Sequence, residues 1–516
     1  MNGAERMIRA AVEHGLEVCF ANPGTTEMPF VNALDSAGQM CAVLGLHENV
    51  CTGAADGYAR MTGKPALTLL HLGPGFANGL ANLHNARRAY SPVVNLIGEH
   101  AAWHLAADPP LASDIERLTG WAGRWTRRTA AADSVVRDMT EAVAVARARR
   151  GGIASLIVPH DIQLADAASA PVVPLRIEGY PRVAEDQVEV AARLLATARR
   201  PALLLGGNAL FGAGLEAAGQ LAAAIGAALI AEVGFARLDV GRGRPRVARL
   251  PYFPEQAAAL LDGFDVVVVA GTKLPVSFFG YHDKPARYLE GRDGVCHLAA
   301  AEEDAATALA AVLQAMPARA GQAVPPSSNG ADGGTVNTAL DPDGIGRVVA
   351  AEQPEDAITV VTAVSSGAPY SVHSPNAPPH TQLALTGGAI GEGMAMALGA
   401  AVAAPDRRVI TLQADGSGAY IMQALWSQAR QGSKVTTVIF ANRRYRILEM
   451  EQERAGIEAG PIAADLARLD DPPLDWPLIA RGMGVQAETV EDTDGLTRAL
   501  RRGLAEPGPY LIEALM

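Results

Sequence analysis

The sequence predicts an α/β protein made of three doubly wound parallel-sheet domains. Short runs of branched apolar residues alternate with alanine-rich helical patterns, and these runs are apolar at successive positions rather than at every second one. Such runs are typical of parallel strands that helices cover on both faces of a sheet. The predicted strands are 66–70, 93–97, 153–158, 202–205, 266–270, 358–362, 409–413, 436–440 and 510–513.

Two stretches interrupt this alternation and divide the chain. Residues 161–181 are rich in Ala and Pro without a clear period, and residues 317–342 form a low-complexity segment of Pro, Gly, Ser and Asn. A length of 516 residues also favours about three domains of ordinary size. We therefore predict domains at 1–165, 182–316 and 343–516.

Composition excludes several classes of protein. The 43 Lys and Arg against 55 Asp and Glu give a net charge of −12 without a basic cluster, so we expect no nucleic-acid partner. The apolar runs are far shorter than the ~20 residues that cross a bilayer, so we expect no membrane-spanning segment. The four cysteines lack metal-ligand spacing, and the N-terminus lacks the apolar core of a signal peptide. We expect reduced thiols and a cytoplasmic protein.

The strongest chemical signal lies in the third predicted domain. Asp415 follows the predicted strand 409–413, and Asn442 follows the predicted strand 436–440. One strand and its helix take about 30 residues in a parallel sheet, so both side chains should emerge at the carboxyl ends of neighbouring strands. Carboxylate and amide oxygens suit Mg²⁺, which commonly takes its remaining ligands from phosphates and water. The pattern predicts a site for a metal-bridged diphosphate.

Neighbouring residues suit the same ligand. Gly416 would let the backbone approach a phosphate, and Ser417 offers a hydroxyl near a helix N-terminus. A glycine-rich segment, residues 386–399, precedes them and would let a flat cofactor lie against the backbone. The alternative for the Asp415 and Asn442 motifs is a simple turn after each strand. The glycine-rich segment by itself is weak evidence, because Rossmann-like sites also use glycine-rich junctions.

Further motifs make the combination specific. Glu48 begins an alanine-rich helix, and its continuation at 54–65 reads AADGYARMTGKP. The chain also has the GPG turn at 73–75, the glycine-rich segment, and Asp415 with Asn442. In the order and spacing of these motifs it resembles the superfamily of thiamine diphosphate (ThDP) dependent 2-oxo acid decarboxylases and acetolactate synthases. Within it, residues 22–25 (NPGT), His71 and residues 415–429 are most similar to benzoylformate decarboxylases.

The resemblance implies a fold, a cofactor and an assembly. The first domain would bind the pyrimidine ring, the second would be a central domain, and the third would bind the diphosphate. The expected ligands are ThDP, Mg²⁺ and a small 2-oxo acid, whose keto-side carbon–carbon bond the enzyme would make or break. The expected assembly is a homodimer or homotetramer with active sites between subunits.

The resemblance also assigns roles to the cofactor-binding residues. Glu48 would hydrogen-bond N1′ of the pyrimidine, the alternative being a helix-start carboxylate stabilised by the helix dipole. Ile390 would hold the cofactor bent, and the carbonyl of Gly388 would orient its amino group. The metal ligands would be Asp415, Asn442 and the backbone carbonyl of Arg444.

Other residues match positions that face the substrate. His71 would relay protons or hold the substrate carboxylate, and Thr25 would hydrogen-bond that carboxylate. His282 is a candidate for a second active-site histidine, although the local alignment slips and an exposed loop position is the alternative. Ile447 and Leu448 would face the substrate. For each of these residues an ordinary structural role is the competing interpretation.

The chain departs from the family pattern at three places. Ala414 stands where the family has Gly, and Ala441-Asn442 stands where it has Asn-Asn, although the metal-binding second Asn is retained. Glu392 occupies a position that is usually apolar or aromatic. We therefore expect an unusually polar pocket near Glu392.

Three alternative functions remain open from the sequence. A Rossmann-type oxidoreductase would need a dinucleotide fingerprint, which the glycine-rich junctions fit poorly. A catalytically silent ThDP-binding paralogue would bind the cofactor without turnover. An acetolactate synthase would be expected to bind FAD, but residues 271–279 do not resemble the flavin-contacting stretch, so we expect no flavin.

Overall fold

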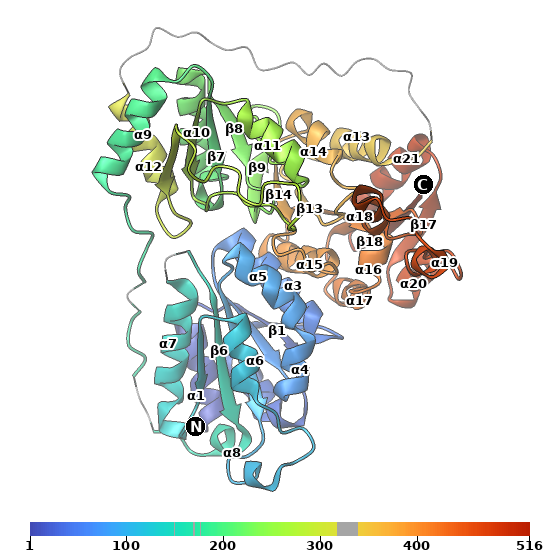
Figure 1. Cartoon of the computed structure of the whole chain (residues 1–516). Helices are drawn as coiled ribbons and strands as arrows, with labels where there is room; N and C mark the ends of the chain where they lie inside the picture. The colour runs from blue at the N-terminus through green and yellow to red at the C-terminus, as the bar shows by residue number, and fades with distance from the viewer. Residues whose placement is uncertain (149, 169–170, 176, 317–338) are drawn as a thin grey trace. The chain divides into compact units, whose positions relative to one another are not determined.

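The computed structural model describes residues 1–516 except 149, 169–170, 176 and 317–338. Most of the predicted linker at 317–342 therefore lies outside the described residues. The chain forms two compact units, which Figure 1 traces by colour along the sequence. Unit 1 comprises residues 1–177, 338–370 and 385–516, and unit 2 comprises residues 178–337 and 371–384.

The first sheet of unit 1 has six parallel strands in the order β2-β1-β3-β4-β6-β5. Its strands are β1 (Val18–Asn22), β2 (Cys41–Leu44), β3 (Ala66–Leu70), β4 (Val93–Glu99), β5 (Trp125–Arg128) and β6 (Ile153–Pro159). The helices around it are α1 (Gly3–Glu13), α2 (Met28–Ala37), α3 (Glu48–Thr62), α4 (Leu72–Asn78), α5 (Leu80–Ala89), α6 (Ile115–Ala122), α7 (Val135–Arg147) and α8 (His160–Leu164). Short 3-10 turns occur at η1 (Thr25–Glu27), η2 (Leu105–Ala107) and η3 (Ala132–Ser134).

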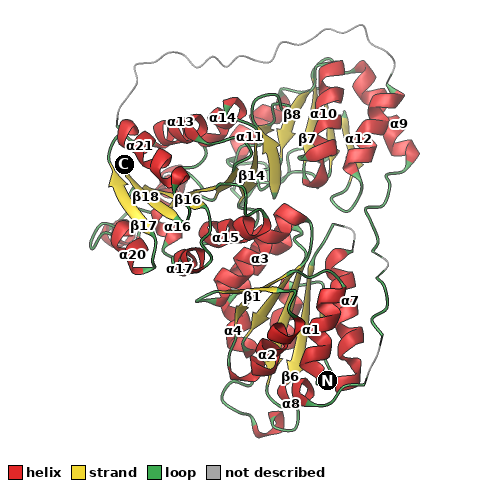
Figure 2. Cartoon of the chain, turned by 180° about the vertical axis from the view of Figure 1, so that it is seen from behind, coloured by secondary structure: helices red, strands yellow, loops and turns green. Residues whose placement is uncertain are grey.

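Helices cover both faces of this sheet, as Figure 2 shows. Along β1, Val18 and Phe20 join one buried cluster with α3, α5 and α6, whereas Cys19 and Ala21 join another with α1, α2 and α7. Alternate side chains of a strand point to opposite faces, so every position of β1 has an apolar layer to enter. This explains why the strands read as continuous apolar runs.

The second sheet of unit 1 contains five parallel strands in the order β17-β18-β16-β15-β13. They are β13 (Ile358–Val361), β15 (Val409–Ala414), β16 (Val435–Ala441), β17 (Gln486–Val490) and β18 (Tyr510–Leu515). The associated helices are α13 (Pro342–Glu352), α15 (Gly393–Ala403), α16 (Asp415–Gly418), α17 (Gln423–Arg430), α18 (Arg446–Ala455), α19 (Pro461–Leu466), α20 (Trp476–Gly482) and α21 (Thr493–Ala505).

Unit 2 has its own parallel sheet in the order β10-β8-β7-β11-β12. Its strands are β7 (Pro201–Leu205), β8 (Ala228–Ala231), β10 (Ala248–Arg249), β11 (Val266–Ala270) and β12 (Val295–Ala299). The helices are α9 (Glu185–Thr197), α10 (Gly212–Ile225), α11 (Pro254–Asp262) and α12 (Ala305–Ala315), with a 3-10 turn at η4 (Gly207–Ala209). β9 (Arg237–Val240) pairs antiparallel with β14 (His380–Ala384), and α14 (Tyr370–His373) and η5 (Ser374–Asn376) precede β14.

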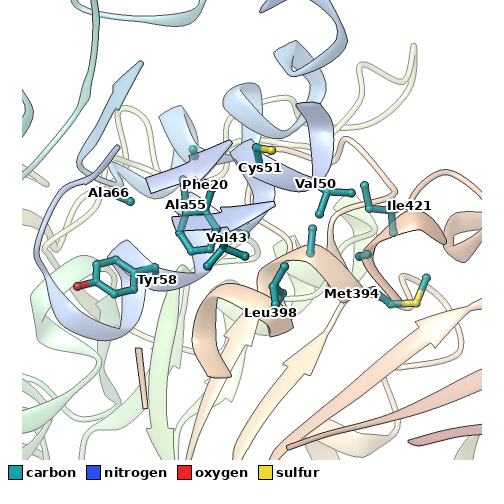
Figure 3. Packing of buried hydrophobic residues seen from close by; sticks show 14 of the residues in the cluster. Phe20, Val43, Val50, Cys51, Ala55, Tyr58, Ala66, Met394, Leu398 and Ile421 are labelled. Carbon is teal, nitrogen blue, oxygen red and sulfur yellow. The ribbon is translucent and has the colours of Figure 1, made fainter. Parts of the chain in front are cut away.

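The two halves of unit 1 pack through α3 and α15. Both helices carry glycines where they cross: a Cβ on Gly57 would collide with the carbonyl oxygen of Met396, and a Cβ on Gly399 would collide with that of Ala54. The backbones therefore touch without intervening side chains. Figure 3 shows the buried cluster beside this crossing, which combines residues of α3 such as Val50 with residues of α15 such as Leu398.

The structure confirms the predicted α/β class and its three sheets of mainly parallel strands. Each of the nine predicted strands overlaps an observed one. The boundaries 1–165, 182–316 and 343–516 stay a prediction. All four cysteines are free thiols, and Cys41 is exposed while the other three are buried.

Across the residues that the structure describes, no helix combines the length and the apolar character needed to cross a bilayer.

We expect Gly57→Ala to destabilise unit 1. The added methyl group would collide with the backbone carbonyl of Met396, and overpacking of this kind costs about 1–3 kcal/mol. Urea unfolding followed by tryptophan fluorescence measures this loss selectively, because all tryptophans belong to unit 1. They are Trp103, Trp121, Trp125, Trp426 and Trp476.

Gly120→Ala is the matched control. Gly120 lies within α6, and apart from its chain neighbours and the backbone of α6 itself no heavy atom lies within 4 Å of the position its Cβ would occupy. Both substitutions gain about 1 kcal/mol of helix propensity, so the difference between the two variants isolates the collision. Equal free energies of unfolding for the two variants would contradict the close α3–α15 contact.

Candidate active site

The carboxyl edge of the first sheet carries one group of predicted site residues. β1 lies between β2 and β3, so the topological switch point of this sheet is the gap between β1 and β3. Open α/β sheets bind their ligands at such points. Thr25 lies in the turn after β1, and His71 directly follows β3. The fold therefore brings both segments to a position suited to a ligand.

A buried carboxylate holds the imidazole of His71. Nδ1 of His71 lies 2.7 Å from Oε2 of Glu27, whose side chain is fully buried. Oε2 also accepts a bond of 2.9 Å from the backbone N–H of Gly24. The close contact between Glu27 and His71 requires glycine at two positions. A Cβ on Gly24 would collide with the imidazole, and a Cβ on Gly98 would collide with the Glu27 carboxylate. Since Glu27 engages Nδ1, the other ring nitrogen, Nε2, remains available for chemistry.

The hydroxyl nearest to this pair comes from Thr26. Its Oγ1 donates to Oε1 of Glu27 at 2.7 Å and lies 3.4 Å from Nδ1 of His71. The predicted residue Thr25 starts the 3-10 turn with an exposed side chain. The role of Thr25 toward a substrate stays a prediction.

Glu48 begins α3, as the sequence predicts, and is 8% exposed. Its Oε2 accepts a hydrogen bond of 2.9 Å from the side-chain amide of Asn78. A Cβ on Gly75, in the predicted GPG turn, would lie 2.7 Å from its Oε1. The carboxylate is thus held at a nearly dry helix N-terminus by one amide and a close glycine turn.

The part of the glycine-rich segment that precedes α15, residues 386–392, contacts α5. The Asn85 side chain binds the backbone of Ala389 twice, donating to its carbonyl at 2.8 Å and accepting from its N–H at 3.2 Å. Gly388 and Gly391 have φ angles of 82° and 91°, which only glycine adopts readily. Ile390 lies between these constrained positions and is partly exposed. The segment therefore presents Ile390 from a backbone fixed on both sides.

The ends of β15 and β16 form the second group of predicted site residues. The two strands pair in parallel, and the buried carboxylate of Asp415 directly follows β15. Its Oδ1 accepts from the N–H of Gly416 at 2.7 Å, and its Oδ2 accepts from the N–H of Arg443 at 2.6 Å. Asn442 precedes Arg443, and its Oδ1 accepts from the N–H of Arg444 at 3.1 Å. The fold thus brings together the strand ends that carry Asp415, Asn442 and Arg444.

The residues after Asp415 are tightly packed. Ser417 is buried, and its Oγ donates to the carbonyl of Ala414 at 3.1 Å. A Cβ on Gly416 would lie 2.5 Å from the ring of Tyr445. The turn formed by residues 415–417 is therefore closed on one side by an aromatic ring, and position 416 requires glycine.

The donor set fits a hard cation. Burial raises the pKa of Asp415, and a divalent cation beside the carboxylate would favour its ionised form. Each of its oxygens accepts one backbone bond and keeps a lone pair for a metal. Within the described ranges, no cluster of three or more His, Cys, Asp or Glu side chains suits a metal. The predicted site differs from such clusters because it uses one carboxylate, one amide and one carbonyl.

The remaining predicted residues lie in different surroundings. His282 belongs to unit 2, where its side chain is fully exposed and lies 2.9 Å from the carboxylate of Asp283. Ile447 and Leu448 lie in the first turn of α18, just beyond the Asn442 turn, and Leu448 is 49% exposed. Glu392 is fully buried, and the unusually polar pocket expected near it stays a prediction.

Sequence reasoning missed three polar residues that shape these sites. Glu27 lies two residues beyond the NPGT motif, and an acidic residue so close to that motif was the available signal. The roles of Asn78 and Asn85 could not be predicted from the sequence, because their hydrogen-bond partners are distant in the chain and an isolated Asn in a helix is common.

Comparison with known proteins places these sites in context. Residues 1–116 match the family model described as thiamine pyrophosphate enzyme, N-terminal TPP binding domain, and residues 365–514 match its C-terminal TPP binding domain. The chain is 44% identical over its whole length to the Mycobacterium tuberculosis protein IlvX, of which it covers 99% and which bears the name of an acetolactate synthase large subunit. It is 30% identical to a Pseudomonas aeruginosa benzoylformate decarboxylase, covering 97% of this chain and 96% of that protein.

Solved structures agree with this grouping. A ThDP-dependent 4-hydroxybenzoylformate decarboxylase from Rhodococcus jostii RHA1 is 26% identical and superposes with a TM-score of 0.88, covering 99% of this chain and 98% of that one. A benzoylformate decarboxylase from Polynucleobacter necessarius, at 21% identity and a TM-score of 0.87, shares the fold over 100% of this chain and 99% of its own. The predicted resemblance is confirmed, and the chain belongs to the family of thiamine pyrophosphate-dependent enzymes.

Proposed function

We propose that the chain is a ThDP- and Mg²⁺-dependent lyase that decarboxylates a 2-oxo acid without oxidation and can join the product to a second carbonyl compound. The observation that carries the proposal is that the paired strands β15 and β16 bring the Asp415 and Asn442 turns together. The first sheet separately positions His71 and Glu48. The decarboxylases of Pseudomonas aeruginosa and Rhodococcus jostii support the substrate class.

The third predicted domain would hold the diphosphate end of the cofactor. Asp415, Asn442 and the carbonyl of Arg444 would bind Mg²⁺, and Gly416 and Ser417 would face the phosphates. When bound, the thiazolium ring of ThDP supplies an electron sink for cleavage next to a keto group. The chain would contribute binding, orientation and exclusion of water around it.

The first predicted domain would hold and move protons. Glu48 would share a proton with N1′ of the aminopyrimidine from its nearly dry position at the start of α3. From the third predicted domain, the carbonyl of Gly388 would orient the amino group of the aminopyrimidine, and Ile390 would support the cofactor. His71, oriented by Glu27 through Nδ1, would use Nε2 to exchange a proton with the reacting group or to hold the substrate carboxylate, with Thr25 as a further donor.

Acetolactate synthase-type ligation is the second candidate function, and the similarity to IlvX favours it. A panel of 2-oxo acids that includes pyruvate, with identification of the products, separates the two. Release of an aldehyde supports the decarboxylase, whereas condensation of two pyruvates supports the synthase. We propose that either activity requires a homodimer or homotetramer with active sites between subunits.

Asp415→Ala should abolish Mg²⁺-dependent ThDP binding. The substitution removes the one carboxylate of the proposed metal site, and isothermal titration with and without Mg²⁺ measures the effect. Asp406→Ala, which removes an exposed carboxylate from the same domain, should bind like the wild type. Tight ThDP binding by Asp415→Ala in the presence of EDTA would exclude this metal site.

Glu48→Gln should slow hydrogen–deuterium exchange at C2 of bound ThDP by about 10²–10⁴-fold, the usual contribution of general acid–base assistance. Glutamine keeps the size and the Asn78 contact but cannot share the proton. Quenched-exchange NMR on fully loaded protein makes the measurement, with Glu13→Gln at an exposed helix end as the control. Unchanged exchange at equal cofactor occupancy would leave Glu48 as a helix-start carboxylate.

Gly24→Ala should lower kcat nearly as much as His71→Ala, because the new methyl group would displace the imidazole from Glu27. General acid–base loss of about 10²–10⁴-fold is expected for His71→Ala. The double variant should be no worse than His71→Ala alone, since both changes disable the same group. Additive losses in this cycle would show that Gly24 acts independently of His71.

A further inference from the structure

A buried charged cluster lies where α3 meets the glycine-rich segment before α15. Asp56 accepts two bonds from Arg60, at 2.9 Å from Nε and 2.5 Å from Nη2, and a further bond from the hydroxyl of Ser91. Nη2 of Arg60 also donates to Oγ1 of Thr386 at 3.1 Å. Glu392 completes the cluster, with Oε1 at 3.8 Å from the same Nη2. All three ionisable side chains are at most 1% exposed.

The charges in this cluster do not balance if both acids are ionised. The Asp56 carboxylate accepts hydrogen bonds from two nitrogens of the Arg60 guanidinium and neutralises its charge. No hydrogen bond of ordinary geometry reaches either carboxyl oxygen of Glu392 from the described residues, although Asp56 and Asn85 lie beside it. The groups that face it are the charged side chains of Asp56 and Arg60 on α3 and the amide of Asn85 on α5. Burying an unpaired second carboxylate here is strongly unfavourable, so the neutral acid is the stable form.

Two physical effects favour the neutral acid. Burial raises the pKa of Glu392 well above its ordinary value, and the nearby Asp56 carboxylate raises it further. A protonated Glu392 has an O–H to donate, and Asp56 is the acceptor beside it. The resulting pair would be a carboxylic acid bonded to a carboxylate that a guanidinium already holds.

The cluster also lies beside residues that we assign to the cofactor site. Asp56 and Arg60 belong to α3, the helix that Glu48 begins. Residues 386–391, the part of the glycine-rich segment that carries Gly388 and Ile390, begin at Thr386 and are directly followed by Glu392. Asn85 faces Glu392 and also fixes the backbone of Ala389. The cluster therefore joins α3 to both ends of the segment assigned to the cofactor.

We propose that Glu392 is a positioning residue that acts as a neutral acid: its proton bonds Asp56 and locks residues 386–391 onto α3 in the arrangement that binds ThDP. The inference rests on the proposed cofactor site. Ionisation of Glu392 places two carboxylates beside one guanidinium, so the segment separates from α3 and the cofactor affinity falls.

This role predicts a sign for the pH dependence. A carboxyl group whose native pKa is raised stabilises the native arrangement at low pH and loses that contribution as pH rises through the raised pKa. ThDP affinity should therefore fall on the alkaline side, by up to about tenfold per pH unit for a single proton. Glu392→Gln keeps a neutral hydrogen-bond donor and should bind ThDP at neutral pH like the wild type, without the alkaline loss.

The proton itself can be observed without cofactor. In infrared spectra of the cofactor-free protein at neutral pH, the wild type should show a carboxylic-acid carbonyl band that Glu392→Gln lacks. Asp56→Asn should lose the same band, because Glu392 then becomes the counterion of Arg60 and ionises. Glu232→Gln is the control: burial raises the pKa of Glu232 to about 7, but in unit 2, so this variant must retain the Glu392 band.

The outcomes separate this inference from the proposed function. Loss of the band in Glu392→Gln and Asp56→Asn, with alkaline loss of ThDP affinity in the wild type alone, supports the inference. Spectra of Glu392→Gln and wild type that do not differ in this band, or identical pH dependence of their affinities, would overturn it. Failure of the wild type to bind ThDP at any pH would instead overturn the proposed cofactor site, whatever the infrared spectra show.

Discussion

The close crossing of α3 and α15 is the contact on which the organisation of unit 1 depends. Glycines at the crossing let two helix backbones touch, which fixes their separation more strictly than contacts between side chains do. Glu48 begins one of these helices, and the segment with Gly388 and Ile390 leads into the other. The crossing therefore determines how the start of α3 is placed relative to the glycine-rich segment.

Much of this architecture could be predicted from the sequence. Strands buried on both faces leave an apolar run, so β3, β4, β11 and β16 were readable. The prediction missed both edge strands of the first sheet: β5 contains Arg127 and Arg128, and β2 has only four residues, two of them exposed. It also missed β1, although this strand is buried and lies inside the sheet. The attachment of residues 371–384 to unit 2 also left no trace, because it depends on pairing with β9, far away in the chain.

The candidate site was predictable where a residue's place in the sequence and its chemistry point to a ligand. It was less predictable where side chains hold one another in position. Asp415 and Asn442 follow consecutive parallel strands, so topology alone brings their strand ends together. The Glu27 contact with His71 depends on glycines at positions 24 and 98, and the two Asn contacts depend on the packing of α5. Such contacts follow from tertiary packing, which a local motif does not encode.

The wide separation of α3 and α15 in the sequence affects how the chain can fold during synthesis. Val50 and Ala54 of α3 belong to a cluster that needs Met394 and Leu398, and several hundred residues must be translated between them. At about 5–20 residues per second, the ribosome takes roughly 20–70 s to supply α15 after α3. During that interval the glycine-bearing apolar face of α3 has no native partner from α15. The nascent chain therefore needs a temporary cover for this surface, such as a chaperone or a transient contact with its own sheet.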